Sequence, residues 1–388
     1  MQESKVALKI CKQYDSEIIS KCLKECFDLL GGLNKFVKPK MKVLIKPDLY
    51  EATTPNEAKT TNPYVISALA DLIAREGASC IIADSPKGNF NQSRLDNVYI
   101  KTKMLEVSNE GNAMLNVNDD ITIINNSKGV CCRDIYIIDA VNQADVIINV
   151  GKFRCDKYLG LIGCSQNLFG LVPGNVKKLI KSRCYNLKSY YNYIIDLNEA
   201  LESKVALNIL DGIVSCEANN DPRILNAILV GENCYNVDEV ALKIINQNPQ
   251  TLLLNESATR HKFNFNADII GDNLQSLVCS DYNYSRLYEN VGRGSSKHFK
   301  RKYNKLQKRP VISSALCKGC KICENNCPMK AIKMQNGAMG QYADIDYSKC
   351  ITCFKCVDNC PYKVVTTKTP FGYRAIEKTL KRKSKQQD

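Results

Sequence analysis

The chain has 388 residues, of which 44% are hydrophobic and 24% charged, a composition typical of a folded protein with two or three domains. No stretch approaches the roughly 18 consecutive apolar residues that a membrane-spanning helix needs, so the sequence argues against a transmembrane segment. The first residues lack the apolar stretch and cleavage site of an export signal, and we therefore expect a cytoplasmic protein.

The formal net charge of +14 is concentrated in the last quarter of the chain. Residues 1–290 hold 32 Lys and Arg against 34 Asp and Glu, whereas residues 291–388 hold 22 against 6. This shift predicts a domain boundary near residue 290. We therefore divide the chain into an α/β domain, a basic linker, a cysteine-rich domain and a basic tail, at residues 1–289, 290–309, 310–370 and 371–388.

Short runs rich in Val and Ile recur through the first domain and predict buried parallel strands at 42–47, 79–84, 145–150 and 205–212. A crossover helix is expected to start at Pro63 and end before Gly77, because Val65, Leu69 and Leu72 share one face. We expect further helices at about 16–30, 187–202 and 236–247. This alternation predicts an α/β fold, with a mostly parallel sheet and flanking helices.

Cysteine is unusually frequent, since the chain has 20, of which eight lie between Cys317 and Cys360. These eight form two copies of the pattern Cys-x2-Cys-x2-Cys-x3-Cys-Pro. Three thiolates at this spacing can each bind a different iron of a 4Fe-4S cluster, whereas the fourth points toward the other cluster. We therefore predict two 4Fe-4S clusters with crosswise ligands, one bound by Cys317, Cys320, Cys323 and Cys360, and the other by Cys350, Cys353, Cys356 and Cys327.

The segment from about 310 to 370 resembles the bacterial two-cluster ferredoxins, which implies a small α+β fold and one-electron transfer. The alternative is a pair of zinc sites, although zinc sites usually use pairs of cysteines. The apolar residues expected to screen the clusters from water are Ile322, Ile332, Ile345, Ile351 and Val364. Outside this segment, Cys155 and Cys164 are either reactive thiols or, more commonly for free cysteines, small buried hydrophobes.

Short motifs follow one another through the first domain: KPD at 46–48, TNP at 61–63, DSP at 84–86, ADVIINVGKF at 144–153, QNLFGLVPG at 166–174, LDG at 210–212 and VDEVA at 237–241. In this order they resemble the family called domain of unknown function 362, whose members are often fused to a ferredoxin module. The resemblance implies an α/β fold and an association with iron-sulfur redox chemistry, but it defines no reaction.

Three motifs depart from that family's pattern. Asn62 stands at the histidine of Thr-x-His-Pro, and Gln166 stands where a lysine precedes Asn. In Lys-x-Lys-x-His, Arg154 stands at the second lysine and Asp156 at the histidine. The histidines of this chain, His261 and His298, lie outside the motifs. The sequence therefore argues against a histidine general base in the first domain.

Polar residues follow several predicted strands, at the edge where open α/β sheets bind their ligands. We therefore choose as candidate catalytic residues Lys46, Asp48, Asp84, Lys152 and Asn167. Lys152 and Asp84 are expected to share a polar cleft for a metal or an anionic substrate. The alternative is ordinary turn and cap chemistry, with Asp84 capping the next helix and Asp211 in a turn.

These features predict an iron-sulfur electron-transfer protein that connects an acidic redox partner with a small-molecule site in the α/β domain, as an oxidoreductase. In the alternative, the α/β domain is a non-catalytic docking module that carries the ferredoxin to a partner enzyme. Nucleic-acid binding is a weaker alternative, because the basic segments carry no recognised motif and few aromatic residues. No Gly-x-Gly-x-x-Gly or Walker motif supports a nucleotide cofactor.

Overall fold

The computed structural model describes most of the first 284 residues and much of the segment from 309 to 368. The described residues are 4–88, 90–129, 132, 134–157, 159–174, 176–177, 180, 187–249, 266–284, 309–327, 330–337, 340–347, 350 and 355–368. The predicted basic tail and, apart from Arg309, the predicted linker lie outside them. The chain forms two compact units. The first consists of Met1–Asn126, Asp134–Lys177 and Leu197–Glu289, and the second consists of Ser127–Arg133, Lys178–Asp196 and Asn290–Asp388.

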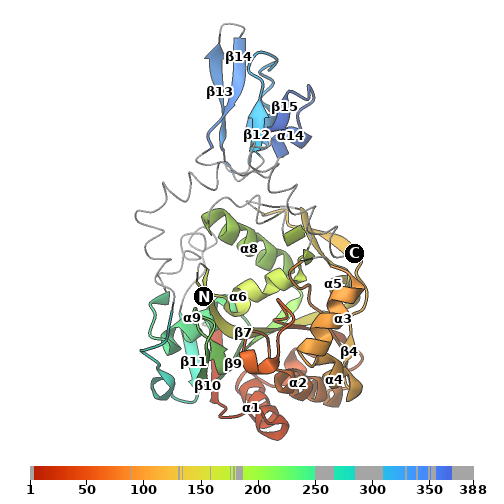
Figure 1. Cartoon of the computed structure of the whole chain (residues 1–388), viewed down its shortest axis with the longest axis vertical. Helices are drawn as coiled ribbons and strands as arrows, with labels where there is room; N and C mark the ends of the chain where they lie inside the picture. The colour runs from red at the N-terminus through yellow and green to blue at the C-terminus, as the bar shows by residue number, and fades with distance from the viewer. Residues whose placement is uncertain are drawn as a thin grey trace, which may run out of the picture. The chain divides into compact units, whose positions relative to one another are not determined.

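The first unit is built on a large mixed sheet (Figure 1). Its strands follow the order β11-β1-β10-β9-β7-β2-β3-β4, and β8 pairs with β7. Neighbouring strands are parallel, except that β10 runs antiparallel to β1 and β9, and β8 to β7. The strands are β1 (Ser4–Ile10), β2 (Lys42–Pro47), β3 (Ser79–Ile82), β4 (Met114–Leu115), β7 (Val146–Asp156), β8 (Gly160–Leu161), β9 (Val205–Cys216), β10 (Pro222–Gly231) and β11 (Ala267–Gly271). The predicted α/β class with a mostly parallel sheet is confirmed.

The central strands were visible in the sequence because they are buried on both faces, as in β2, where every residue after Lys42 is buried. Two of them, β7 and β9, run further than predicted. The predictions stopped near the first polar residues, whereas Lys152 and Asp211 lie inside these strands. The interpretations of Lys152 as a strand-end residue and of Asp211 as a turn residue are therefore wrong.

Helices cover both faces of the sheet. Two helices, α1 (Ser16–Leu29) and α2 (Pro63–Arg75), pack against each other, and α6 (Gly163–Asn167) packs against α9 (Cys234–Ile244). Figure 1 shows these two pairs on opposite sides of the sheet. The other described helices are α3 (Gln92–Lys101), α4 (Met104–Asn109), α5 (Ala140–Gln143) and α8 (Leu187–Leu201), with short 3-10 turns at η1 (Leu33–Lys35), η2 (Pro55–Glu57), η3 (Leu168–Leu171) and η6 (Leu274–Leu277).

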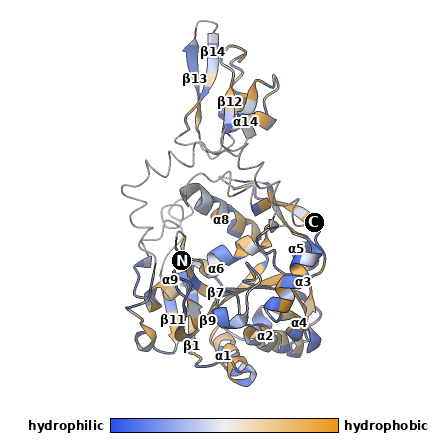
Figure 2. Cartoon of the chain, viewed as in Figure 1, coloured by the Kyte–Doolittle hydropathy of each residue, from blue (hydrophilic) through white to orange (hydrophobic). Residues whose placement is uncertain are grey.

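The helices begin where the sequence provides caps. The side chains of Asp15, Asn62 and Asn233 accept backbone N–H bonds from the first turns of α1, α2 and α9. Gly77 follows α2 with a φ of +74°, a conformation that glycine adopts without strain. Hydrophobic and hydrophilic residues alternate along α1 and α2 (Figure 2), because one face of each helix is buried. The four predicted helices are thus confirmed.

The cysteine-rich segment forms two antiparallel strand pairs. β12 (Arg309–Ile312) pairs with β15 (Val365–Lys368), and β13 (Ile332–Gly337) pairs with β14 (Gly340–Ile345). Two short helices, α13 (Ile322–Asn325) and α14 (Lys355–Asp358), each carry a motif cysteine. The small buried core consists of Cys323, Ile332, Ala343, Ile345, Cys356 and Val365. This segment has the predicted small α+β composition. A separate hairpin is formed by β5 (Ile121–Asn125) and β6 (Asp134–Ile138).

Candidate functional site

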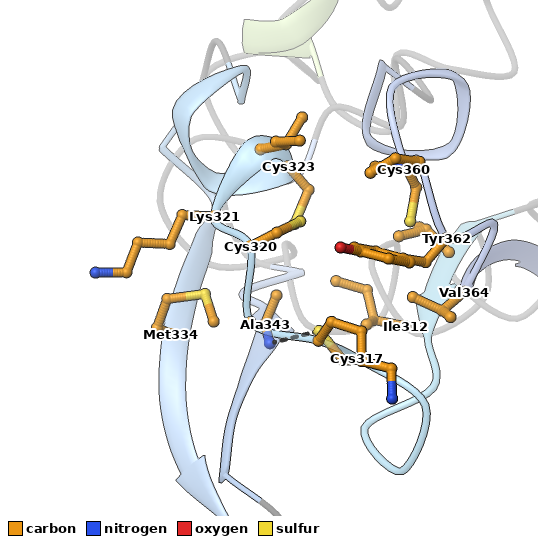
Figure 3. Close-up of a pocket in the computed structure, with 15 residues that line it drawn as sticks. Ile312, Cys317, Cys320, Lys321, Cys323, Met334, Ala343, Cys360, Tyr362 and Val364 are labelled. Atoms are coloured by element: carbon orange, nitrogen blue, oxygen red, sulfur yellow. Dashed lines mark hydrogen bonds between the residues drawn. The ribbon is translucent and has the colours of Figure 1, made fainter.

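A pocket in the cysteine-rich segment is lined by cysteines from both sequence motifs (Figure 3). It contains about 340 Å³ of empty space, part of which is open to solvent. The cysteines around it are Cys317, Cys320, Cys323 and Cys360. These are the four that the sequence assigns to one cluster, and the structure brings them together although Cys360 comes from the second motif.

The first three of these cysteines lie on a tight loop that the local sequence allows. Gly319 has a φ of +59°, and a Cβ at this position would lie 2.7 Å from the carbonyl oxygen of Gln341. Lys321 also adopts a left-handed conformation, immediately before α13. The backbone N–H of Ala343 donates to Cys317 Sγ over 3.4 Å (Figure 3). A donor at this place stabilises negative charge on sulfur, as a metal-bound thiolate requires.

The second set of cysteines is described in part. Cys356 belongs to the buried core, and Cys327 and Cys350 pack against that core. The N–H of Ala331 donates to Cys327 Sγ over 3.2 Å. Cys353 lies outside the described residues. For these four cysteines the predicted ligand set therefore stays a prediction.

The expected apolar screen is present in part. Ile332 and Ile345 are buried and Val364 is half-buried, whereas Ile351 lies outside the described residues. Ile322 lines the pocket but remains 36% exposed, because it begins the short helix α13 at the rim. Ile322 and Val364 line the pocket itself, whereas Ile332 and Ile345 belong to the buried core against which Cys317 and Cys360 pack.

The pocket suits the group that the motif implies. Four thiols with a nearby N–H donor are the donor set of a 4Fe-4S cluster, in which each sulfur binds a different iron. Within the described residues, no group of three or more His, Cys, Asp or Glu side chains is positioned to hold a single metal ion.

In the first unit, three of the candidate residues form one buried polar network. Lys46 Nζ lies 3.1 Å from Asp84 Oδ2 and donates to Asn167 Oδ1, also over 3.1 Å. Asp84 additionally accepts from the backbone N–H groups of Leu49 and Ser85. It therefore does not cap the next helix, which begins after Asn91. Asn167 continues the network through Asn149 to Asn208. All three candidates are at most 4% exposed.

Lys152 belongs to a second network. Its Nζ lies 2.8 Å from Asp211 Oδ2 and 2.8 Å from the hydroxyl of Tyr14, which in turn donates to Asp211 Oδ1. Burial raises the pKa of Tyr14, so that its hydroxyl stays protonated and can donate. Asp211 Oδ2 also accepts from the backbone N–H of Asn62. The residue at the family's histidine position therefore contributes its backbone here, while its side chain caps α2.

Asp48 forms a third pair, with Arg154. The Arg154 Nε atom lies 2.7 Å from Asp48 Oδ2. The backbone N–H of Asp48 donates to the hydroxyl of Thr61, which donates to the carbonyl oxygen of Val150. The arginine that departs from the family's Lys-x-Lys-x-His pattern thus neutralises the aspartate of the KPD motif.

The expectation that Lys152 and Asp84 share a cleft is wrong. Lys46 is paired in register with Asn149, three residues before Lys152 on β7. Because side chains alternate between the faces of a strand, Lys46 and Lys152 point to opposite faces. Asp84 bonds to Lys46, whereas Lys152 bonds to Asp211. The motifs therefore meet near one edge of the sheet but form separate networks.

Sequence reasoning missed several partners. Asp211 was noted at a predicted strand end or in a turn, but neither it nor Tyr14 or Arg154 was chosen as a candidate catalytic residue. Tyr14 lies outside every motif, so no pattern indicated it. Arg154 could have been found, since it occupies a motif position two residues after Lys152 in a parallel strand next to β2.

The two cysteines weighed as reactive thiols are buried. Cys164 is fully buried and Cys155 is 5% exposed. Burial raises the pKa of both thiols, which disfavours the reactive thiolate. Beside Cys164, Asp238 accepts from the N–H groups of Cys164 and Ser165, and burial raises the pKa of Asp238 to about 7.

The fold and the cysteine-lined pocket define an iron-sulfur protein that joins an α/β domain to a ferredoxin-type domain. A family model described as a 4Fe-4S dicluster domain matches residues 316–364. The model of the domain of unknown function DUF362 matches residues 43–243, more than half of the chain. The chain therefore belongs to the DUF362 family, and both expected resemblances are confirmed.

Two known proteins are similar to parts of this chain. The thylakoid-associated protein sll1697 of Synechocystis sp. is 27% identical over 258 residues, which cover 64% of this chain and 76% of the relative. The lactate racemase apoprotein from Thermoanaerobacterium thermosaccharolyticum is 15% identical, with a TM-score of 0.41, over 62% of this chain and 57% of the racemase. None of the described helices combines the length and hydrophobicity that crossing a bilayer requires.

Proposed function

We propose that this chain is an electron-transfer protein that holds two 4Fe-4S clusters. The observation that carries the proposal is the pocket that gathers thiols from both motifs. The proposed ligands are Cys317, Cys320, Cys323 and Cys360 for one cluster, and Cys350, Cys353, Cys356 and Cys327 for the other. A bound 4Fe-4S cluster supplies one-electron transfer.

The residues of the chain tune this chemistry by hydrogen bonding and by burial. The N–H groups of Ala343 and Ala331 donate to Cys317 and Cys327, and they stabilise the more negative, reduced state. Ile332 and Ile345 lie in the buried core against which Cys317 and Cys327 pack, and there they limit the access of water to these sulfurs. The rim at Cys320 is exposed, which gives an external partner a short path to the first cluster.

The partner we propose is an acidic electron carrier. Residues 291–388 carry 22 basic against 6 acidic side chains, and such a surplus attracts an acidic protein over a distance that salt shortens. The test replaces Lys378, Lys381, Arg382, Lys383 and Lys385 with Gln and measures electron transfer from an acidic flavodoxin across ionic strengths. A flatter salt dependence at unchanged iron content supports steering by the tail. An unchanged rate and salt dependence contradict it.

For the α/β domain we propose a reductase site for a small anionic acceptor, near the buried lysine Lys46. The KPD motif places Lys46 at the end of β2, and the ends of parallel strands are where α/β folds bind ligands. The second candidate function is a non-catalytic docking module that carries the ferredoxin to a partner enzyme. It is favoured by the pairing of Lys46, Lys152 and Arg154, each with a carboxylate.

One experiment separates the two candidates. Anaerobically reconstituted protein is reduced with dithionite, freed of excess reductant and mixed with 2-oxo acids, enoates and nitrogen oxyanions. Reoxidation that Lys46→Gln abolishes supports the reductase, provided that Lys35→Gln, which alters an exposed ion pair, leaves it intact. If none of the acceptors reoxidises the clusters while flavodoxin does, the docking module is supported.

A further inference from the structure

Three cysteines outside the cluster motifs gather where β1 meets α1. Cys11 directly follows β1, and Cys22 and Cys26 lie one turn apart on the buried face of α1. Cys11 and Cys26 are fully buried, whereas Cys22 is 8% exposed. All three are free thiols. None of them is used by the proposed electron-transfer function.

Two of the three thiols lie close together. Cys22 Sγ donates to the carbonyl oxygen of Ile10, the residue before Cys11, over 3.7 Å, and Cys11 Sγ donates to that of Gln13 over 3.6 Å. These contacts keep the two sulfurs together at the end of a strand and on a packed helix, without a long flexible segment between them.

The surroundings make the two thiols unequal. The interaction between the two thiols lowers the pKa of Cys22, and together with burial it raises the pKa of Cys11. The ammonium group of Lys9 also favours a Cys22 thiolate, while Glu25 and Asp272, which both pair with Lys9, oppose it. The Cys26 thiol has its pKa raised by burial. An ionisable thiol beside a protonated one is the arrangement found in reactive dithiols.

We propose that Cys11 and Cys22 form a reversible dithiol-disulfide pair that exchanges two electrons with small disulfides. Cys22 is the attacking thiol, because it alone of the pair reaches the surface. Its thiolate attacks one sulfur of R–S–S–R, the S–S bond breaks, and the leaving thiolate takes up a proton. Cys11 then loses its proton and attacks Cys22 Sγ, which releases the second R–SH. Two protein thiols are oxidised, and one disulfide is reduced to two thiols.

The pair lies beside the network of Lys152. The carboxylate of Asp211 acts electrostatically on Cys11, and both Asp211 and Cys11 act on the Tyr14 hydroxyl. Forming the disulfide removes an ionisable thiol from this neighbourhood. Oxidation or reduction of the pair therefore changes the electrostatics of the neighbouring polar network, which is built from the family's motifs.

The test uses the full, anaerobically reconstituted chain. It is equilibrated in mixtures of 2-mercaptoethanol and 2-hydroxyethyl disulfide, quenched with acid, alkylated with N-ethylmaleimide and analysed by peptide mass spectrometry. We expect Cys11 and Cys22 to lose alkylation together as the disulfide fraction rises, and to appear in one cross-linked peptide pair. Iron content should not change.

Matched variants make the outcome decisive. Cys26→Ser changes a buried cysteine one turn away and should leave the transition unchanged, whereas Cys22→Ser should keep Cys11 alkylated throughout. If Cys22→Ser does not fold, as judged by circular dichroism, Cys11→Ser tests the pair from the other side and should leave Cys22 without its intramolecular cross-link. Persistent alkylation of both thiols in the parent, or a cross-link between Cys22 and Cys26, would overturn the proposal.

Discussion

Lys152 Nζ lies 2.8 Å from Asp211 Oδ2 in the interior of the sheet, where the two side chains are 1% and 0% exposed. The two residues are paired directly across the parallel strands β7 and β9. Water cannot solvate either charge, so each depends on the other and on Tyr14 and Asn62. This dependence leads to the first prediction.

Replacing Lys152 with Met should lower the free energy of unfolding by about 3 to 5 kcal/mol, because it leaves a buried carboxylate without its cation. The double variant Lys152→Met with Asp211→Leu should lose less than the single one. Lys35→Met is the control, since its ion pair with Glu232 is half exposed and is worth at most about 1 kcal/mol. Urea unfolding followed by circular dichroism measures all three. Equal losses for Lys152→Met and Lys35→Met would contradict the structure.

The second prediction concerns Asp238, whose pKa burial raises to about 7 from an ordinary value of 3.8. Between about pH 4 and pH 7 the folded chain holds a proton that the unfolded chain releases. The free energy of unfolding should therefore fall as pH rises through this window, by up to about 1.4 kcal/mol per pH unit from this group. Urea unfolding of the parent and of Asp238→Asn between pH 5 and pH 8 measures the difference. If both proteins have the same slope, Asp238 does not titrate there.

The third prediction concerns the cluster ligands. The reconstituted parent should contain about eight irons with matching sulfide, and Cys320→Ala should contain about half as much. The variant should also unfold its cysteine-rich segment more readily, because ligation energy contributes to the stability of a small metal-bound fold. Cys234→Ser, in a buried cysteine of the α/β unit, is the control and should keep the full iron content. One or two zinc ions and no visible absorption in the parent would rule out the clusters.

The fourth prediction concerns Gly170, which the Lys46 network approaches closely. A Cβ at this position would meet Asp84 Oδ1 and Lys46 Nζ, each at 2.3 Å. Gly170→Ala should therefore force the buried ion pair apart and lower the melting temperature, with a loss of about 1 to 3 kcal/mol for the added methyl group. Differential scanning fluorimetry of the two proteins provides the measurement. A melting temperature equal to that of the parent would show that the network has room to move.

The large elements of this fold were predictable because their patterns are local. The residues of β2 and β3 form apolar runs, and Asn62, Pro63 and Gly77 mark the ends of α2 within the sequence itself. The antiparallel strand β10 was not predicted, although it follows β9 after five residues and pairs with it. Its pairing with β1 joins residues more than two hundred positions apart. No local pattern carries that information.

The candidate site was predictable in its composition but not in its pairing. The spacing of the cysteines alone indicated which of them gather around one pocket, because ligands of a 4Fe-4S cluster must follow one another at fixed intervals along the chain. For the buried charges, the motifs named Lys46, Asp84 and Lys152 as polar candidates, but Lys152 lies inside β7 and belongs to another network than the other two. Which face each side chain occupies depends on strand register, and the register is fixed by packing across the whole sheet.

The pairing of β12 with β15 has a consequence for how this protein is assembled from parts. Arg309 lies opposite Lys368, so the polypeptide enters and leaves the cysteine-rich segment at neighbouring points. A segment whose two ends lie together can be inserted into a surface loop of another protein without stretching its host, and the added cost of closing the loop is small. We therefore expect that the cysteine-rich segment can be inserted into a surface loop of an unrelated scaffold and not only attached to a chain end.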